Sequence, residues 1–231
     1  SMNKMLTAVA TLQLVQSGKL RLDRPLGTYL TDYPNAGVAS QVTPHHLLTH
    51  TGGTGDIFGP LFTANRTELR TTSDYLRLYG TRGLQFTPGA KHVYSNYGFM
   101  LLGAIIERVS GKSYDDHIAA RVLAPAGMTS TGSAPEDSNV PGRSVGYTKQ
   151  LVPGTLVSNA PTLPYRGTPA GGGYSTVGDF ARFATALQEH RLLDKAHTEL
   201  LVSGKVAVGS GVQYAYGFVD RAIGGRRFVG H

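Results

Sequence analysis

The sequence predicts an α+β fold, with a helical part over roughly residues 1–203 and an antiparallel sheet that starts within residues 213–231. Two observations support this prediction: apolar residues recur at helical spacing in several segments, whereas residues 213–231 alternate around Gly224-Gly225 as paired strands do. The 231 residues are 40% hydrophobic and contain no internal repeat or long linker, so we expect a single domain over residues 1–231. Because an isolated hairpin is only marginally stable, either the remaining strands of the sheet lie in sequence outside this chain or the chain is mostly helical.

The first half of the chain contains the clearest helical patterns. Residues 1–18 place apolar side chains on one face and end at Gly18. Thr43 and Pro44 supply the N-cap and first position of a short helix. Helices are also expected over residues 68–79 and 97–109, and the second of these is apolar around most of its circumference and closed by a glycine.

The second half alternates helices with loops. Ser113 is expected to cap a helix that Pro125 stops. Residues 126–174 are rich in Gly, Pro, Ser and Thr, which predicts long ordered loops with one short strand. Two further helices are expected, one from a cap at Ser175 or Thr176 to about residue 189 and one over residues 194–202.

The composition excludes several classes of function. The chain has no cysteine, which rules out disulfides, thiolate nucleophiles and Cys-ligated metal centres, and no apolar run approaches the length of a transmembrane span. Its 22 basic and 15 acidic residues give a net charge of +7. The basic residues are spread along the chain without a run that interleaves aromatic residues, so we expect no nucleic-acid partner.

Ser1 and Lys4 are the first pair of residues with recognisable chemistry. They stand at i and i+3, so their side chains share one face of a helix. A serine needs a neighbouring base to act as a nucleophile, and a lysine serves when burial or positive surroundings lower its pKa. Three alternatives stay open from these residues alone: Ser1 is a cloning remnant ahead of Met2, an N-cap, or a terminal nucleophile activated by its own amine.

Two further motifs carry polar side chains suited to the same chemistry. Tyr94-Ser95-Asn96 follows a Pro-Gly turn and directly precedes the apolar helix over residues 97–109. A tyrosine at this point is able to transfer a proton, and Asn96 is able to bind Lys4 or a substrate amide, although it could equally serve only as a helix cap. Gly230-His231 follows the alternating segment at the end of the sequence.

Together these three motifs resemble those of the serine β-lactamase and penicillin-binding-protein superfamily. The resemblance is to the branch that contains class C β-lactamases, D-Ala-D-Ala carboxypeptidases, D-aminopeptidases and family VIII carboxylesterases. It extends in the expected order over essentially the whole chain, and it is carried also by His46–Gly53, by Tyr97-Gly98 running into Leu101–Gly103, by Leu123–Met128 and by Ala170–Thr176.

The resemblance implies a β-lactamase/transpeptidase-like fold and a serine hydrolase that forms a covalent acyl-enzyme on an ester, amide or β-lactam carbonyl. Ser1 would attack the carbonyl, Lys4 and Tyr94 would transfer the proton with the choice of base left open, and Asn96 and His231 would bind substrate. The third motif in this family is Lys or His, any residue, then Gly. A neutral His231 in place of Lys weakens carboxylate recognition, which favours peptidase or esterase activity over strong β-lactamase activity.

The same resemblance implies that the chain is the middle of a longer protein, cut at both ends. His231 stands without the glycine of its motif. In the family, one N–H donor of the oxyanion hole comes from the nucleophile and the other from the strand that follows the third motif, which would lie beyond His231. The loss of one such donor typically costs about 100- to 1000-fold in turnover.

Two other functions stay open. The first is a β-lactamase-like scaffold or binding protein without turnover. The presence of four motif side chains argues against it: Ser1, Lys4, Tyr94 and Asn96. The second is a metallohydrolase, because His46 and His50 stand at i and i+4 with Asp56 nearby, although Leu47 occupies the place where the metalloprotease pattern needs Glu. We therefore expect no metal and no cofactor, and as partner a small-molecule or peptide acyl substrate. No motif specifies an oligomeric state, and the resemblance leaves localisation open between periplasmic or secreted and cytoplasmic.

Overall fold

Helices are the main regular structure of the first two hundred residues in the computed structural model, which describes residues 1–231. The α-helices are α1 (Asn3–Gln16), α2 (Ala36–Gln41), α3 (Pro44–Leu48), α4 (Pro60–Asn65), α5 (Thr72–Tyr79), α6 (Asn96–Ser110), α7 (Tyr114–Ile118), α8 (Ala124–Ala126), α9 (Val177–Gln188) and α10 (Lys195–Val202). A π-helical turn at Ala119–Leu123 joins α7 to α8, and short 3-10 turns occupy Leu26–Thr28, Arg66–Glu68 and Ala160–Thr162.

The strands form two antiparallel sheets. β1 (Tyr147–Thr148) pairs with β2 (Val157–Ser158). The larger sheet is a meander in which β3 (Val206–Gly209), β4 (Val212–Tyr214), β5 (Val219–Ile223) and β6 (Arg226–Gly230) follow one another in order. Gly224 and Gly225 connect β5 to β6 with φ of 56° and 76°, the left-handed backbone that a two-residue hairpin turn requires. The predicted helices and antiparallel sheet, and with them the α+β fold, are therefore confirmed.

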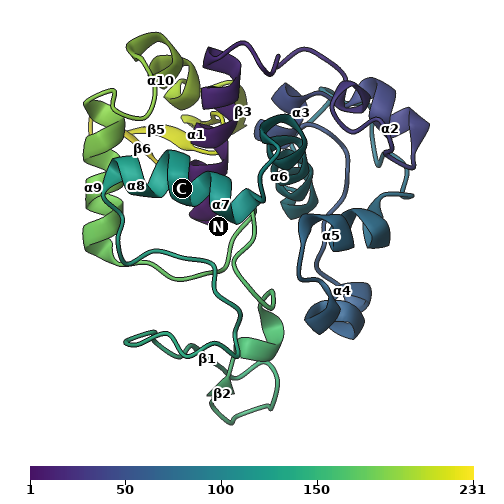
Figure 1. Cartoon of the computed structure of the whole chain (residues 1–231), viewed down its shortest axis with the longest axis vertical. Coiled ribbons are helices and arrows are strands. Elements are labelled where there is room, and N and C mark those ends of the chain that lie inside the picture. The colour runs from purple at the N-terminus through teal and green to yellow at the C-terminus, as the bar shows by residue number, and fades with distance from the viewer.

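Helix α6 occupies the centre of the molecule. It packs against α1, α3, α5 and α7, and its apolar residues Phe99, Leu101, Leu102, Ile105 and Ile106 are fully buried. In Figure 1, α6 stands between a part that holds α1, α9, α10 and the large sheet and a part that holds α2 to α5. The left-handed Gly111, with φ of 70°, ends the helix as the sequence predicts. A helix that is apolar on nearly all sides is thus placed where every side has a neighbour.

The starts of α1 and α6 carry two of the three motifs. Ser95 caps α6 by accepting a hydrogen bond from the Gly98 N–H at 2.9 Å, so Tyr94 and Asn96 flank the first turn of the helix. Lys4 lies in the first turn of α1, which is buried along most of its length. Both polar motifs therefore extend from helices that the core holds rigidly.

The structure corrects three of the predictions. The helix that Ser113 caps passes through a π-helical turn and ends at Ala126, one residue beyond Pro125, with the left-handed Gly127 as its C-cap. The large sheet begins at Val206 and not near residue 213, since β3 pairs with β4. The long 126–174 segment contains two short strands where one was expected.

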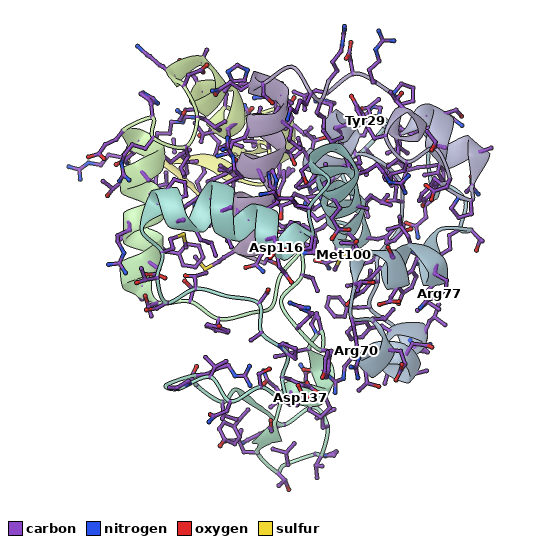
Figure 2. All side chains as sticks on the ribbon, in the orientation of Figure 1. Tyr29, Arg70, Arg77, Met100, Asp116 and Asp137 are labelled. Carbon is purple, nitrogen blue, oxygen red and sulfur yellow. The ribbon has the colours of Figure 1, made fainter.

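The segment around β1 and β2 projects from the rest of the molecule, at the bottom of Figure 1. Tyr165 anchors its base: its hydroxyl donates to Asp137 at 2.7 Å, and the Arg70 guanidinium lies over its ring at 4.6 Å. Figure 2 shows Arg70 and Asp137 close to this junction. No helix of the structure has both the length and the apolar character needed to cross a membrane.

Candidate active site

Ser1 lies just before α1, and Lys4 lies in the first turn of that helix. Their side chains approach to 3.4 Å between Lys4 Nζ and Ser1 Oγ, as the i, i+3 spacing predicts. Ser1 is exposed, whereas Lys4 is fully buried. The arrangement offers a hydroxyl to solvent and places an amine directly beneath it.

Tyr94 brings a second proton-carrying group to the serine. Its hydroxyl donates to Ser1 Oγ at 2.8 Å and lies 3.1 Å from His231 Nε2. The ring of Tyr94 covers Lys4, whose Nζ is 4.7 Å from the ring centroid. Burial raises the pKa of Tyr94 above its usual value, so its hydroxyl keeps its proton near neutral pH.

Asn96 and the backbone of Ala170 hold the amine of Lys4. Lys4 Nζ donates to Asn96 Oδ1 at 2.8 Å and to the Ala170 carbonyl at 2.5 Å. The absence of a side chain at Gly171 allows the backbone to approach Ser1, because a Cβ there would come within 3.2 Å of Ser1 N. The glycine-rich 170–173 segment therefore passes directly beside the serine.

The surroundings of Lys4 favour its neutral form. Burial lowers the pKa of Lys4 from its ordinary 10.5 to about 7, although the negative charge of Asp56 acts in the opposite direction. Both accepting groups, Asn96 Oδ1 and the Ala170 carbonyl, are uncharged, so they offset only part of the cost of burying an ammonium ion. Near pH 7 the amine is therefore able to accept a proton.

His231 closes the other side of Tyr94. Its Nδ1 lies 3.2 Å from the Gly217 carbonyl and 3.3 Å from the Tyr214 hydroxyl. These two contacts fix the orientation of the imidazole ring. Burial, followed by the charge of Lys4, lowers the pKa of His231 to about 4. The imidazole is consequently neutral at pH 7 and acts as a hydrogen-bonding group without charge.

Two residues that the sequence interpretation assigned to other uses belong to this site. Asp56 accepts the Asn96 backbone N–H at 2.9 Å and the Asn96 side-chain amide at 3.2 Å. His50 accepts the Ser95 N–H at 3.1 Å through Nδ1, and its ring stacks on Tyr94 at a centroid distance of 4.2 Å. Its backbone is left-handed, with φ of 56°, which is uncommon outside glycine and is the one local feature that draws notice to it.

The histidines considered as metal ligands are engaged in hydrogen bonds. His46 Nδ1 accepts the Thr43 N–H at 3.2 Å in a capping box, and His50 Nε2 lies 3.0 Å from the Tyr214 hydroxyl. Burial lowers the pKa of His50 to about 2, so with Nδ1 accepting, the ring carries its proton on Nε2 and donates it to Tyr214. The structure gathers no group of three or more His, Cys, Asp or Glu side chains suited to a metal ion.

A cavity of about 1000 Å³ lies against the glycine-rich segment. It is lined mainly by residues of the two loops that run through 129–146 and 158–176, among them Gly172 and Gly173. Its lining mixes polar and apolar side chains, and it does not include Ser1 or Tyr94. The cavity therefore borders the glycine-rich segment but not the serine itself.

Known proteins are similar to this chain in both sequence and fold. All of residues 1–231 match the Beta-lactamase protein family. A penicillin-binding protein of Bacillus subtilis (strain 168) is 29% identical over 95% of this chain and 51% of its own length, and Esterase EstB of Burkholderia gladioli is 34% identical over 61% of this chain and 40% of its own. The crystal structure of a penicillin binding protein from Bacillus halodurans superposes with a TM-score of 0.89 at 34% identity, covering 98% of this chain and 71% of that one. Where a curated relative matches nearly all of this chain, the chain spans only about half of that relative's length.

Proposed function

The chain belongs to the Beta-lactamase family, and we propose that it is a serine hydrolase that forms a covalent acyl-enzyme on an ester, amide or β-lactam carbonyl. The observation that carries this proposal is the convergence of three groups on one hydroxyl: Tyr94 lies 2.8 Å and Lys4 3.4 Å from Ser1 Oγ, and His231 stands behind Tyr94. Relatives named as an esterase and as penicillin-binding proteins support a hydrolase of this kind. A scaffold without turnover would not need this arrangement.

Lys4 is the better candidate for the base that activates Ser1. A neutral amine has two N–H groups and one lone pair, and the two N–H groups are taken by Asn96 Oδ1 and the Ala170 carbonyl. The lone pair is then left for Ser1 Oγ. A pKa of about 7 makes the amine a suitable acceptor, whereas Tyr94, with its raised pKa, holds its proton.

The reaction proceeds in two halves. Ser1 Oγ bonds to the carbonyl carbon as its proton passes to Lys4 Nζ, and the resulting tetrahedral species expels the alcohol or amine. Tyr94 donates its proton to that leaving group and recovers one from Lys4, so no net proton is lost. A water molecule then attacks the acyl-enzyme by the same route and releases the carboxylic acid and Ser1.

His231 points to the preferred substrate. Since burial keeps its imidazole neutral at pH 7, it provides a hydrogen bond but no positive charge for a substrate carboxylate. A lysine in that place would anchor the carboxylate that β-lactams carry. We therefore propose esterase or peptidase activity on a small-molecule or peptide acyl substrate, with residues 1–231 acting as one catalytic domain.

Intact-mass spectrometry of the full-length gene product tests the proposal. The protein is exposed separately to a penicillin and to a short-chain activated ester, and any adduct is located by peptide mapping. An adduct on the Ser1 peptide that is absent in Ser1→Ala and present in the control Ser40→Ala supports the acyl-enzyme. If neither reagent is consumed and no adduct forms, the nucleophile assignment is wrong and the scaffold alternative takes its place.

A further inference from the structure

Asp56 lies on the loop that follows α3 and contacts Asn96, which in turn contacts Lys4. Its Oδ1 accepts N–H bonds from Asn96 at 2.9 Å and from Ile57 at 2.8 Å, and its Oδ2 accepts one from the Asn96 side-chain amide at 3.2 Å. Arg82 Nη1 donates to the Asp56 carbonyl at 2.7 Å and so fixes the loop itself. The carboxylate thus grips both the backbone and the side chain of Asn96.

These hydrogen bonds determine the orientation of the Asn96 side-chain amide. A carboxylate accepts hydrogen bonds and donates none, so the Asn96 NH₂ group must turn toward Asp56. The amide oxygen then turns toward Lys4 Nζ, where it accepts at 2.8 Å. In the opposite orientation Asn96 would present its NH₂ to an amine and its oxygen to a carboxylate, which leaves both partners unsatisfied.

The orientation of Asn96 determines in turn where the Lys4 lone pair points. With Asn96 Oδ1 and the Ala170 carbonyl each accepting one N–H, the remaining direction on Nζ faces Ser1 Oγ. We propose that Asp56 is a positioning residue that acts on Ser1 through Asn96 and Lys4, by holding the Asn96 amide oxygen against the Lys4 amine. This inference rests on the proposed function of Ser1 and Lys4, and it adds to that function a residue that touches neither substrate nor nucleophile.

Asp56 also carries the one negative charge that faces the amine. Three other titratable side chains lie near Lys4, those of Tyr94, His50 and His231, and burial keeps each of them neutral near pH 7. The charge of Asp56 raises the pKa of Lys4 against the effect of burial. Removal of this charge should therefore move the protonation of Lys4 to lower pH.

The first test is Asp56→Asn, with hydrolysis of p-nitrophenyl butyrate measured across pH. The new amide would present NH₂ to the Asn96 NH₂ group and so favour a flipped Asn96. We expect kcat to fall about 10- to 100-fold with KM changed less than about threefold, and the acid limb of kcat/KM to move to lower pH. The control Asp32→Asn removes an exposed carboxylate paired with Arg108 and should leave both rate and pH profile unchanged.

A second variant exchanges the two side chains. In Asp56→Asn combined with Asn96→Asp, the amide at 56 donates to the carboxylate at 96, which again offers Lys4 an oxygen. We expect activity to recover relative to Asp56→Asn, and the acid limb to move above the wild-type pH, because a negative charge now touches Lys4. A purely structural role for Asp56 predicts neither the recovery nor the opposite shifts.

The outcomes separate this inference from the proposed function. If Ser1→Ala abolishes hydrolysis while Asp56→Asn keeps the wild-type kcat and pH profile, the inference is wrong and the serine mechanism stands. If Ser1→Ala retains activity, the proposed function fails first. Should Asp56→Asn not fold, the double variant decides, and an acid limb at or below the wild-type pH overturns the inference.

Discussion

Lys4 Nζ and Asn96 Oδ1 lie 2.8 Å apart although 92 residues separate them in the sequence. Each residue stands in the first turn of a long buried helix, so the contact brings the N-termini of α1 and α6 together. Helix N-termini carry partial positive charge, which disfavours a protonated amine and favours the negative charge that develops during attack on a carbonyl. The position of the site at two helix starts is therefore itself part of its electrostatics.

The first prediction concerns the pH dependence of hydrolysis. If Lys4 accepts the Ser1 proton, kcat/KM for an activated ester rises with pH through an apparent pKa of about 7, where Lys4 loses its proton. Lys4→Arg keeps the positive charge but cannot act as a base, so we expect a loss of about 100-fold or more and no limb near pH 7. Steady-state kinetics from pH 5 to 9 measure the pH profile of the wild type and the rate of the Lys4→Arg variant. Wild-type rates in Lys4→Arg would exclude Lys4 as the base.

The second prediction concerns stability. Lys4 has a pKa of about 7 in the folded protein and about 10.5 when unfolded, so between these values the unfolded chain binds the additional proton. The penalty for burying Lys4 is complete below pH 7 and disappears as the pH rises toward 10.5. Relative to Lys4→Met, the wild-type free energy of unfolding should rise from pH 7 to 10 with a slope of at most about 1.4 kcal/mol per pH unit.

Urea unfolding followed by circular dichroism at several pH values provides the measurement. Lys112→Met, which removes an exposed amine, is the matched control and should run parallel to the wild type. Parallel curves for Lys4→Met and the wild type would show that Lys4 keeps its ordinary pKa in the folded protein.

A third prediction isolates the Tyr94 hydroxyl. Tyr94→Phe keeps the ring that covers Lys4 and stacks on His50 but removes the bonds to Ser1 Oγ and His231. We expect kcat for ester hydrolysis to fall about 100-fold or more, with the melting temperature nearly unchanged. Tyr147→Phe removes an exposed hydroxyl away from the site and should have no effect. An active Tyr94→Phe would leave proton transfer to Lys4 alone.

The fourth prediction compares two glycines of the same helix. At Gly103 of α6 an added Cβ would lie 2.3 Å from Pro169 Cγ, whereas at Gly98 the nearest atom is 3.4 Å away. Gly103→Ala should therefore destabilise the protein by about 1–3 kcal/mol through overpacking, while Gly98→Ala should be neutral or mildly stabilising. Because Pro169 precedes the carbonyl that holds Lys4, activity should fall with stability in Gly103→Ala only. Equal melting temperatures for the two variants would contradict this packing.

The sequence predicted those features that depend on neighbouring residues. The apolar pattern over residues 97–109 and the following glycine specify α6 almost to its ends, and the i, i+3 spacing specifies the approach of Lys4 to Ser1. Strand β3 was not predicted because its four residues become a strand only by pairing with β4. Helix α4 was missed for a related reason, since six residues give too little periodicity to recognise.

The same distinction applies to the candidate site. The motif residues could be found because each stands in a short recognisable pattern. The roles of Asp56 and His50 could not be predicted in this way, because their contacts with Asn96 and Ser95 span 40 and 45 residues. These contacts exist only once α6 has packed against the loop after α3. Their sequence neighbours suggested a metal site, and the fold instead uses them as acceptors for backbone N–H groups.

His231 follows strand β6, whose residues Arg226 to Val229 are exposed, whereas Lys4 and Asn96 lie within the buried helical core. The two halves of the site thus belong to regions that differ in resistance to local opening. In hydrogen exchange, the β5–β6 amides should exchange through small fluctuations that leave the amides of α6 protected. Activity would then be lost in a partly open state in which His231 has moved away from Tyr94 while α1 and α6 remain folded.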